Sequence, residues 1–285
     1  MVPMPTPHPA QRRALLIAAA AIALWASLAM LSLRLKHVPP FLLVGCSLVL
    51  GSLLGLPRVN LRALRPRVLL LGIYGLFTYH CCLFVALRWA PAVEANLLNY
   101  LWPLLIVVLS PLILPGTSLK RRHVVAALIG FAGAATLIAR GWGETSGSSA
   151  SFVGYGLAIA AAVIWSTYSL LTKRVAPFPT SWIAAFCLAS GLLALGCHAL
   201  FEPRYLPTLS DAPYLLLVGL GPMGGAFYLW DKAMKEGDPR AIGTLAYVAP
   251  LLSTLLLAIS GEGTLNANAL VGAALIVTGA IIGTR

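Results

Sequence analysis

Long apolar stretches recur along this chain, and short polar connections separate them. Each stretch runs for about 17 to 23 residues, which matches the roughly 20 residues of α-helix that cross the hydrocarbon core of a bilayer. The pattern therefore predicts ten transmembrane helices. The first five predicted spans are residues 14–33, 39–56, 67–87, 92–114 and 123–139, and the last five are residues 152–172, 181–201, 213–230, 241–260 and 268–284.

The first apolar stretch has a second interpretation, as a secretory signal. Arg12 and Arg13 precede it, and it contains small residues of the kind found before a cleavage site. The stretch is long for a cleaved signal, however, and its Trp25 has a counterpart later in the chain. A membrane span is therefore the favoured interpretation.

Composition and charge placement agree with an all-α integral membrane protein. Hydrophobic residues make up 59% of the 285 positions and charged residues only 10%, which is more apolar surface than a water-soluble domain buries. The net charge of +12 would suggest nucleic acid as the partner of a soluble protein. Most of the 20 Lys and Arg residues, however, fall in the two terminal segments and in the loops after the even-numbered spans. By the positive-inside rule, both termini are predicted to be cytoplasmic, and no nucleic-acid partner is expected.

The cysteines carry no sign of a metal site. All five fall within predicted spans, and no pair has the Cys-x-x-Cys spacing typical of metal ligands. We therefore expect free thiols, no metal and no cofactor. The five are Cys46, Cys81, Cys82, Cys187 and Cys197.

The second half of the chain repeats the first in collinear blocks. Each half holds an odd number of predicted spans, so the second half begins on the opposite side of the membrane and the repeat is inverted. Inverted repeats are typical of transporters whose substrate site lies between the two halves. The matched pairs are Trp25 with Trp165, Arg34 with Arg174, Gly72 with Gly219, Ala86 with Ala233, Arg88 with Lys235, Tyr100 with Tyr247, Pro103 with Pro250, and Gly133-Ala134 with Gly279-Ala280.

The repeat divides the chain into four parts. Residues 1–13 form a cytoplasmic tail, residues 14–139 the first five-helix repeat, residues 140–151 a connecting loop, and residues 152–285 the second five-helix repeat.

The segment ALRWAPAVEANLLNYLWP, residues 86–103, resembles the drug/metabolite transporter superfamily of EamA type, as does nearly the whole chain. Within that superfamily, EANLLNYLWP is most similar to the branch of bacterial aromatic amino acid exporters. The resemblance implies two inverted five-helix repeats and export of aromatic amino acids across the bacterial inner membrane.

The fourth predicted span carries a polar stripe. Ala92, Asn96, Asn99, Tyr100 and Pro103 share one helix face, and polar groups there must avoid lipid. Hydrogen bonding between helices would satisfy them, and so would a wet cavity, which we favour. Tyr100 and the adjacent Trp102 could present aromatic faces and polar tips to a flat substrate ring.

The third predicted span contributes Tyr79 and His80. Of the five histidines, His80 alone lies near the middle of a predicted span, where ionisable groups are functional candidates. The two interpretations of His80, a substrate or gating group and a neutral side chain bonded to a neighbour, stay open.

Mid-span aromatic residues complete the candidate set. Trp165 and Tyr168 share a face with small and polar residues, so we expect Trp165 to line a cavity, whereas Trp25 has fewer polar companions and is expected to pack in the core. Tyr247 repeats the pattern of the fourth span and should line the same central space. The predicted substrate-binding residues are Tyr79, His80, Asn96, Asn99, Tyr100, Trp102, Trp165, Tyr168 and Tyr247.

The motifs that the sequence lacks limit the possible transport mechanisms. The sequence holds no GxxxxGK[ST] loop for ATP, and its eight acidic residues fall at span ends or in loops, with Glu94 and Asp231 the closest to a span interior. His80 has no acidic partner at its level, which argues against a membrane-embedded enzyme. A channel is a further alternative, but the inverted repeat favours alternating access.

The sequence therefore predicts a transporter of a small neutral or zwitterionic substrate, with weak or absent coupling to protons. Aromatic and other neutral amino acids are the expected substrates. Export of other metabolites or drugs by the same superfamily is the main alternative, and the sequence predicts no oligomeric state.

Overall fold

The computed structural model describes residues 9–138, 149–261 and 267–284, and in this part of the chain the regular secondary structure is helical, with no strand. The predicted all-α class is confirmed for this part of the chain. Three predicted parts lie wholly or partly outside the described residues. They are the tail (residues 1–13), the connecting loop (residues 140–151) and the end of the fifth predicted span (residue 139). The α-helices of the first half are α1 (Pro9–Leu33), α2 (Pro40–Ser52), α3 (Pro66–Ile73), α4 (Tyr79–Trp89), α5 (Ala92–Asn99), α6 (Trp102–Ile113) and α7 (Arg121–Ile138). Those of the second half are α8 (Ser149–Arg174), α9 (Ile183–Phe201), α10 (Ala212–Leu220), α11 (Ala226–Glu236), α12 (Pro239–Leu245), α13 (Val248–Ile259) and α14 (Ala267–Thr284).

Seven helical segments among the described residues are long and apolar enough to cross a membrane. The helix α2 and the segment Leu270–Thr284 are apolar but shorter. The predicted extension of the second span to Leu56 is wrong, because α2 ends at Ser52 and a 3₁₀ turn, Leu56–Arg58, contains Pro57. The seven segments are Pro9–Leu33, Pro66–Trp89, Glu94–Ile113, Ser151–Arg174, Thr180–Phe201, Ala212–Glu236 and Pro239–Ile259.

Two long segments contain a π-helical turn. The turn Tyr74–Thr78 joins α3 to α4, and the turn Gly221–Gly225 joins α10 to α11. The two turns lie at equivalent places of the repeat, 147 residues apart. Because a π turn leaves the regular hydrogen-bond ladder, it reorients the side chains that follow it, and such turns are frequent at functional sites.

Two further segments break into separate helices at the repeated Tyr-x-x-Pro. The first break falls at Tyr100 and Leu101 between α5 and α6, and the second at Ala246 and Tyr247 between α12 and α13. The sequence pattern predicted one continuous helix in each case. Pro103 and Pro250 explain the difference, because proline has no N–H to donate and its ring collides with the carbonyl four residues earlier.

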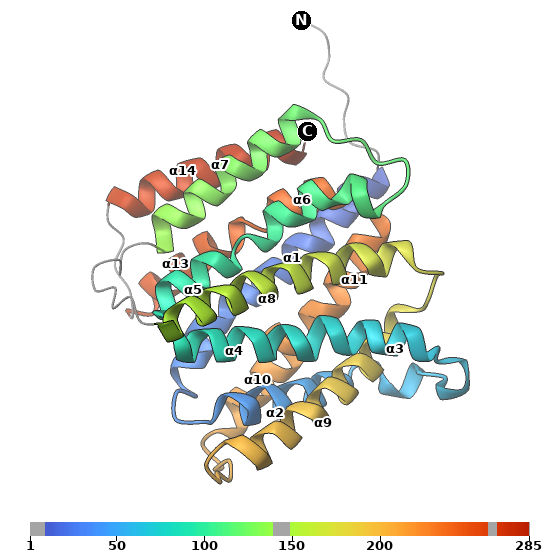
Figure 1. The fold of residues 1–285 in the computed structure, drawn as a ribbon, viewed down its shortest axis with the longest axis vertical. Helices are drawn as coiled ribbons and strands as arrows, with labels where there is room; N and C mark the ends of the chain where they lie inside the picture. The colour runs from blue at the N-terminus through green and yellow to red at the C-terminus, as the bar shows by residue number, and fades with distance from the viewer. Residues whose placement is uncertain (1–8, 139–148, 262–266, 285) are drawn as a thin grey trace, which may run out of the picture.

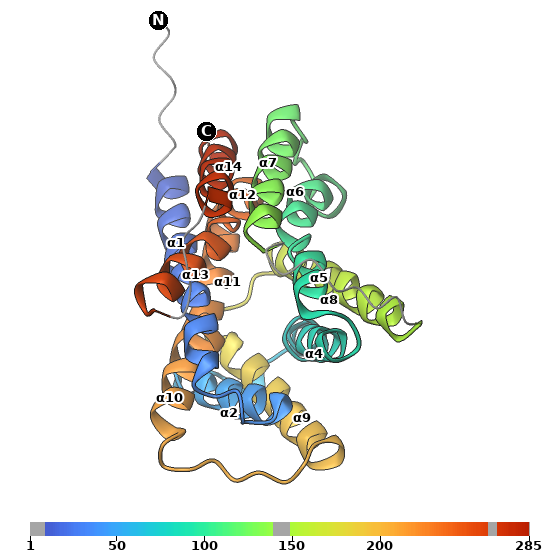
Figure 2. The same cartoon turned by 90° about the vertical axis from the view of Figure 1, so that its left-hand side faces the viewer.

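Helices from equivalent positions of the two halves pack against each other (Figures 1 and 2). Helices α7 and α14 lie side by side at one edge, and α2 and α9 form a second pair at the other edge. Between these pairs, α1 packs on α11 and α13, while α8 packs on α4, α5 and α6.

Small residues bring the backbones of α7 and α14 together. A Cβ added at Gly133 would lie 2.8 Å from the Gly272 carbonyl oxygen, and one at Gly279 would lie 2.7 Å from that of Ala126. Close backbone approach through glycine is a common way for membrane helices to associate. The repeated Gly-Ala pairs therefore serve helix packing.

Candidate functional site

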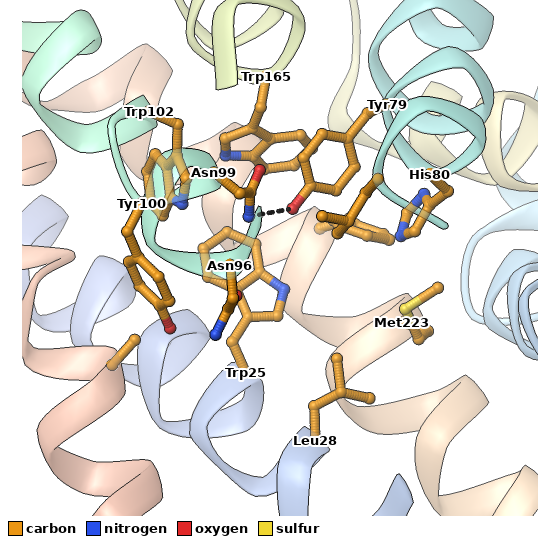
Figure 3. A pocket seen from close by; sticks show the side chains of 13 residues that line it. Trp25, Leu28, Tyr79, His80, Asn96, Asn99, Tyr100, Trp102, Trp165 and Met223 are labelled. Atoms are coloured by element: carbon orange, nitrogen blue, oxygen red, sulfur yellow. Dashed lines mark hydrogen bonds between the residues drawn. The ribbon is translucent and has the colours of Figure 1, made fainter. Parts of the chain in front are cut away.

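A cavity of about 200 Å³ lies in the middle of the helix bundle (Figure 3). We call it the central cavity. Both halves of the chain contribute to its walls. The elements that do so are α1, α4, α5, the start of α6, α8, the π turn before α11, α11 itself and α13. Its lining residues are Trp25, Leu28, Tyr79, His80, Leu83, Asn96, Asn99, Tyr100, Trp102, Trp165, Met223, Phe227 and Ala249.

Aromatic rings make up one side of the central cavity. Trp25 lies at their centre, with its ring centroid 5.6 Å from that of Trp165, 6.2 Å from that of Trp102 and 5.1 Å from that of Trp230. Edge-to-face and tilted pairs at these distances are favourable arrangements for aromatic quadrupoles. The cluster offers ring faces and edges to a flat ligand.

Asn99 brings an unsatisfied polar group to the cavity wall. Its side chain is only 5% exposed, its Nδ2 donates to the Tyr79 hydroxyl at 3.4 Å, and its Oδ1 has no hydrogen-bond partner among the described residues. An unpaired buried carbonyl oxygen costs about 1–3 kcal/mol of stability. The amide of Asn99 is therefore a buried polar group on the cavity wall whose oxygen has an unfilled hydrogen-bonding position.

His80 is held by its own helix. Its Nδ1 lies within hydrogen-bond distance of the Leu76 carbonyl oxygen, and since a carbonyl can only accept, Nδ1 carries the proton. The Nε2 atom has no partner among the described residues. In the neutral ring Nε2 is an acceptor on a residue that lines the cavity. The local bond is present, and a substrate or gating role for His80 stays a prediction.

Seven of the nine predicted substrate-binding residues line the central cavity. Tyr168 is buried beyond Trp165, with their ring centroids 5.4 Å apart, and is absent from the cavity wall. The expectation that Tyr247 lines the central space is wrong. Tyr247 is fully buried beside Phe131, and its hydroxyl accepts a hydrogen bond from the Leu104 N–H at 3.1 Å.

Sequence reasoning missed part of the wall. Trp25 was expected in the core, yet it both packs there and lines the cavity. The pairing of Trp25 with Trp165 was the signal that could have revealed it. The repeat offset of 147 residues also relates Phe227 to His80 and Ala249 to Trp102, and each of these four lines the cavity.

Among the residues that the structure describes, the wall of the central cavity contains no Asp, Glu, Lys or Arg. Glu94 accepts a hydrogen bond from the Tyr155 hydroxyl elsewhere. Asp231 lies inside α11 and is buried, whereas the sequence predicted it just beyond a span, because α11 continues to Glu236. Its carboxylate binds the Thr180 hydroxyl at 2.6 Å and Lys235 at 2.7 Å, so the charge is compensated by a neighbouring ammonium.

The described residues contain no group of three or more His, Cys, Asp or Glu side chains that could hold a metal ion. The five cysteines are free thiols.

Sequence comparison assigns the chain to a known family. The profile of the EamA-like transporter family matches residues 12–139 and again residues 152–284. The chain belongs to the EamA-like transporter family. It is therefore a multi-pass membrane transporter and not an enzyme, as its sequence predicted, and the resemblance to the drug/metabolite transporter superfamily is confirmed.

Named relatives of this EamA-like transporter include aromatic amino acid exporters. The chain is 44% identical to the aromatic amino acid exporter YddG of Ancylobacter novellus, over 95% of this chain and 96% of that one. It is 26% identical to the aromatic amino acid exporter YddG of Salmonella typhimurium, over 82% of each chain. A crystal structure with 43% sequence identity superposes with a TM-score of 0.89 and covers 95% of this chain and 98% of the other.

Proposed function

We propose that this protein exports aromatic and other neutral amino acids across the bacterial inner membrane by alternating access. The observation that carries the proposal is the central cavity, in which aromatic rings and a free amide oxygen meet without any charged side chain. The names of the relatives in Ancylobacter novellus and Salmonella typhimurium support the same substrate class.

The two ends of an amino acid match two parts of the cavity wall. The aromatic side would receive the substrate side chain, with Trp25, Tyr79 and Trp165 as its contacts. The ammonium group would donate to Asn99 Oδ1, which has no other partner, and Asn96 offers a second amide nearby. A hydrogen bond in which one partner is charged is stronger than a hydrogen bond between two neutral groups, so a single bond of this kind can orient the ligand.

The absence of a charge on the wall favours a zwitterion over a cation. A cation would need a carboxylate to offset its desolvation, because burying an unpaired charge is costly. The same absence supports transport that is not coupled to protons. His80 is the one histidine among the residues of the wall, and its Nδ1 is bonded to the Leu76 carbonyl of its own helix.

The arrangement of packing supports an outward-facing state. On α8, Trp165 lines the cavity, while Ser169 and Thr172, farther along the helix, are buried. The Trp230 indole N–H donates to Ser169 Oγ at 3.0 Å, and Lys173 Nζ donates to the carbonyl oxygen of Met234 at 3.1 Å. These contacts join α8 to α11 on the side where α8 ends, which charge placement assigns to the cytoplasm, and they support closure of the central cavity toward that side.

Ten spans in two inverted halves are an architecture suited to alternating access, because one half can rock against the other around a site between them. The two separate profile matches and the equivalent breaks in the two halves support it, with residues 14–139 and 152–285 as the repeats. The predominance of Lys and Arg in one set of loops supports cytoplasmic termini.

Flux measurements in proteoliposomes test the proposal. Labelled Phe, Trp, Leu and Lys would be followed with and without a pH gradient. We expect Phe, Trp and Leu to move down their own gradients without a pH difference, and Lys to stay. Failure of all three neutral amino acids to move would refute the substrate assignment, and strict dependence on the pH gradient would refute uncoupled transport.

A further inference from the structure

A second cavity, of about 690 Å³, lies between the beginning of α3 and the end of α8. We call it the inner cavity, since charge placement assigns this side to the cytoplasm. Its volume falls in the range of roughly 300–1,000 Å³ that small-molecule sites occupy. Its lining residues are Arg65, Pro66, Arg67, Val68, Leu71, Leu171, Val175 and Ala176.

The inner cavity combines two guanidinium groups with apolar walls. Arg65 is fixed, because its Nη2 donates to the carbonyl oxygens of Ala176 at 2.7 Å and Pro177 at 2.8 Å, and its guanidinium lies 5.4 Å from the Trp182 ring centroid. Arg67 is exposed and has no hydrogen-bond or ion-pair partner among the described residues. No acidic residue of the described part of the chain lines the inner cavity. A ligand with an anionic group and an apolar body fits this chemistry, because guanidinium groups bind carboxylates with paired donors.

The inner and central cavities both have walls from α8 and from the segment α3–α4, which pack together along a contact that we call the seam. On α8, Leu171 lines the inner cavity and Trp165, six residues earlier, lines the central one, which corresponds to about 9 Å along the helix axis. On the opposite side of the seam, Leu71 of α3 lines the inner cavity and Tyr79 of α4 the central one.

A layer of side chains that includes Tyr168 and Tyr74 lies between the levels of the two cavities along α8 and the segment α3–α4. Tyr168 fills the space opposite Gly75, where an added Cβ would lie 2.2 Å from the Tyr168 ring. Beside it, the Tyr74 hydroxyl is 2.9 Å from Thr167 Oγ1. Tyr74 and Gly75 belong to the π turn Tyr74–Thr78, so the layer lies where the helix departs from regular geometry.

We propose that the inner cavity is the cytoplasmic docking site of the transported amino acid. In this proposal, Arg67 binds the substrate carboxylate, while Leu71 and Leu171 receive its side chain. The Tyr168 layer separates the docked substrate from the central cavity until the seam opens. The proposal rests on the proposed function, and it adds a second substrate site with its own recognition chemistry.

Sided transport measurements test the docking site. Uptake and efflux of labelled Phe would be measured in right-side-out and everted membrane vesicles that hold wild type, Arg67→Gln or Arg121→Gln. Arg121 is the matched control, because it is an exposed arginine at the start of α7, on the same side of the membrane and away from the cavity. Arg67 is preferred to Arg65, which also joins α3 to the end of α8.

We expect Arg67→Gln to raise the KM for Phe presented from the cytoplasmic side about three- to tenfold, the range of one partly exposed charge-assisted contact. The KM from the opposite side should stay the same, and Vmax should adjust so that Vmax/KM remains equal in the two directions, as uncoupled transport requires. Inhibition by phenylalaninamide, which lacks a carboxylate, should not depend on Arg67. Arg121→Gln should behave as wild type.

Three outcomes would overturn the docking site. The first is an unchanged cytoplasmic KM in Arg67→Gln. The second is an equal loss of potency for phenylalaninamide, which would mean that the carboxylate is not what Arg67 recognises. The third is unchanged transport together with loss of thermal stabilisation by phosphatidylglycerol vesicles relative to phosphatidylcholine vesicles, which would assign the arginines to a lipid headgroup. Failure of the wild type to move Phe at all would instead refute the proposed function.

Discussion

The broken helices α5–α6 and α12–α13 have the same backbone plan but different side chains facing the middle of the molecule. Both break at a tyrosine three residues before a proline. In the first half, the residues at the break and beside it are Asn96, Asn99 and Trp102, all of which line the central cavity. At the equivalent positions of the second half lie Gly243, Ala246 and Ala249. The repeat thus duplicates the backbone, while recognition groups come mainly from one half.

The difference follows from what each break packs against. A Cβ added at Gly243 would lie 3.0 Å from both Ile106 Cγ2 and the Pro103 carbonyl oxygen, so α12 approaches α6 closely. Helix α5 instead turns Asn96 and Asn99 toward the cavity. The two tyrosines diverge in the same way, since Tyr100 lines the cavity and the hydroxyl of Tyr247 binds the first turn of α6.

The largest effect is expected when Gly243 of the second half receives the side chain of its equivalent in the first half, Asn96. Gly243→Asn should prevent close packing of α12 on α6, at a cost of about 3 kcal/mol or more, because overpacked sites relax poorly. The yield of folded protein in size-exclusion chromatography measures this. The reciprocal change, Asn96→Gly, should leave folded protein with weakened transport. Normal folding of Gly243→Asn would show that α12 and α6 do not pack as described.

A second change separates recognition from stability. Asn99→Leu removes the unpaired Oδ1 at similar side-chain volume, so the melting temperature should stay the same or rise, while Phe transport should fall about tenfold, as expected for loss of one hydrogen bond to a charged group. Asn60→Ala in the α2–α3 connection is the control for transport. If Asn99→Leu were both stable and fully active, Asn99 would not contact the substrate.

Replacement by phenylalanine should affect stability at Tyr247 and transport at Tyr100. Tyr247→Phe leaves the Leu104 N–H in the first turn of α6 without its acceptor, which should lower the free energy of unfolding by about 1 kcal/mol. Tyr100→Phe should change stability little and affect transport instead. Thermal melting and flux measured on the same preparations test this contrast, and equal melting temperatures for the two variants would contradict it.

The smallest effect concerns the connections between helices rather than the breaks. The α9–α10 connection carries Asp211, whereas the equivalent α2–α3 connection is basic. The Thr208 N–H and the Tyr205 hydroxyl donate to the Asp211 carboxylate and hold its pKa well below the usual range. Its stabilising contribution is therefore complete above the pKa of an unfolded aspartate, about 4, and is lost as pH falls toward the lower folded-state pKa.

Asp211→Asn should accordingly lower the melting temperature at pH 7. The difference from wild type should shrink only in acid below about pH 4, where Asp211 of the unfolded wild-type chain begins to gain a proton while the folded carboxylate is still charged. Melting curves recorded between neutral and acidic pH check this. A deficit that disappeared on alkalinisation instead would assign it to a different group.

Much of the fold could be predicted from local pattern. Apolar stretches of spanning length indicated the positions of the helical segments, and paired residues such as Trp25 and Trp165 revealed the repeat. Helix periodicity also grouped Asn96, Asn99 and Tyr100 on one face, and these three do line one cavity. These features depend only on residue spacing along a single helix or on similarity between two stretches of chain, so the sequence contains them directly.

Only the tertiary structure decided which neighbouring residues each helix face packs against. Periodicity assigned Tyr247 and Tyr100 the same role, but the neighbour of each tyrosine comes from another helix, and only packing distinguishes a cavity from the first turn of α6. The π turns, the unpaired oxygen of Asn99 and the position of Asp231 inside α11 have the same origin. Each depends on contacts between segments distant in sequence, because burial and hydrogen-bond satisfaction are properties of the assembled helices rather than of any one of them.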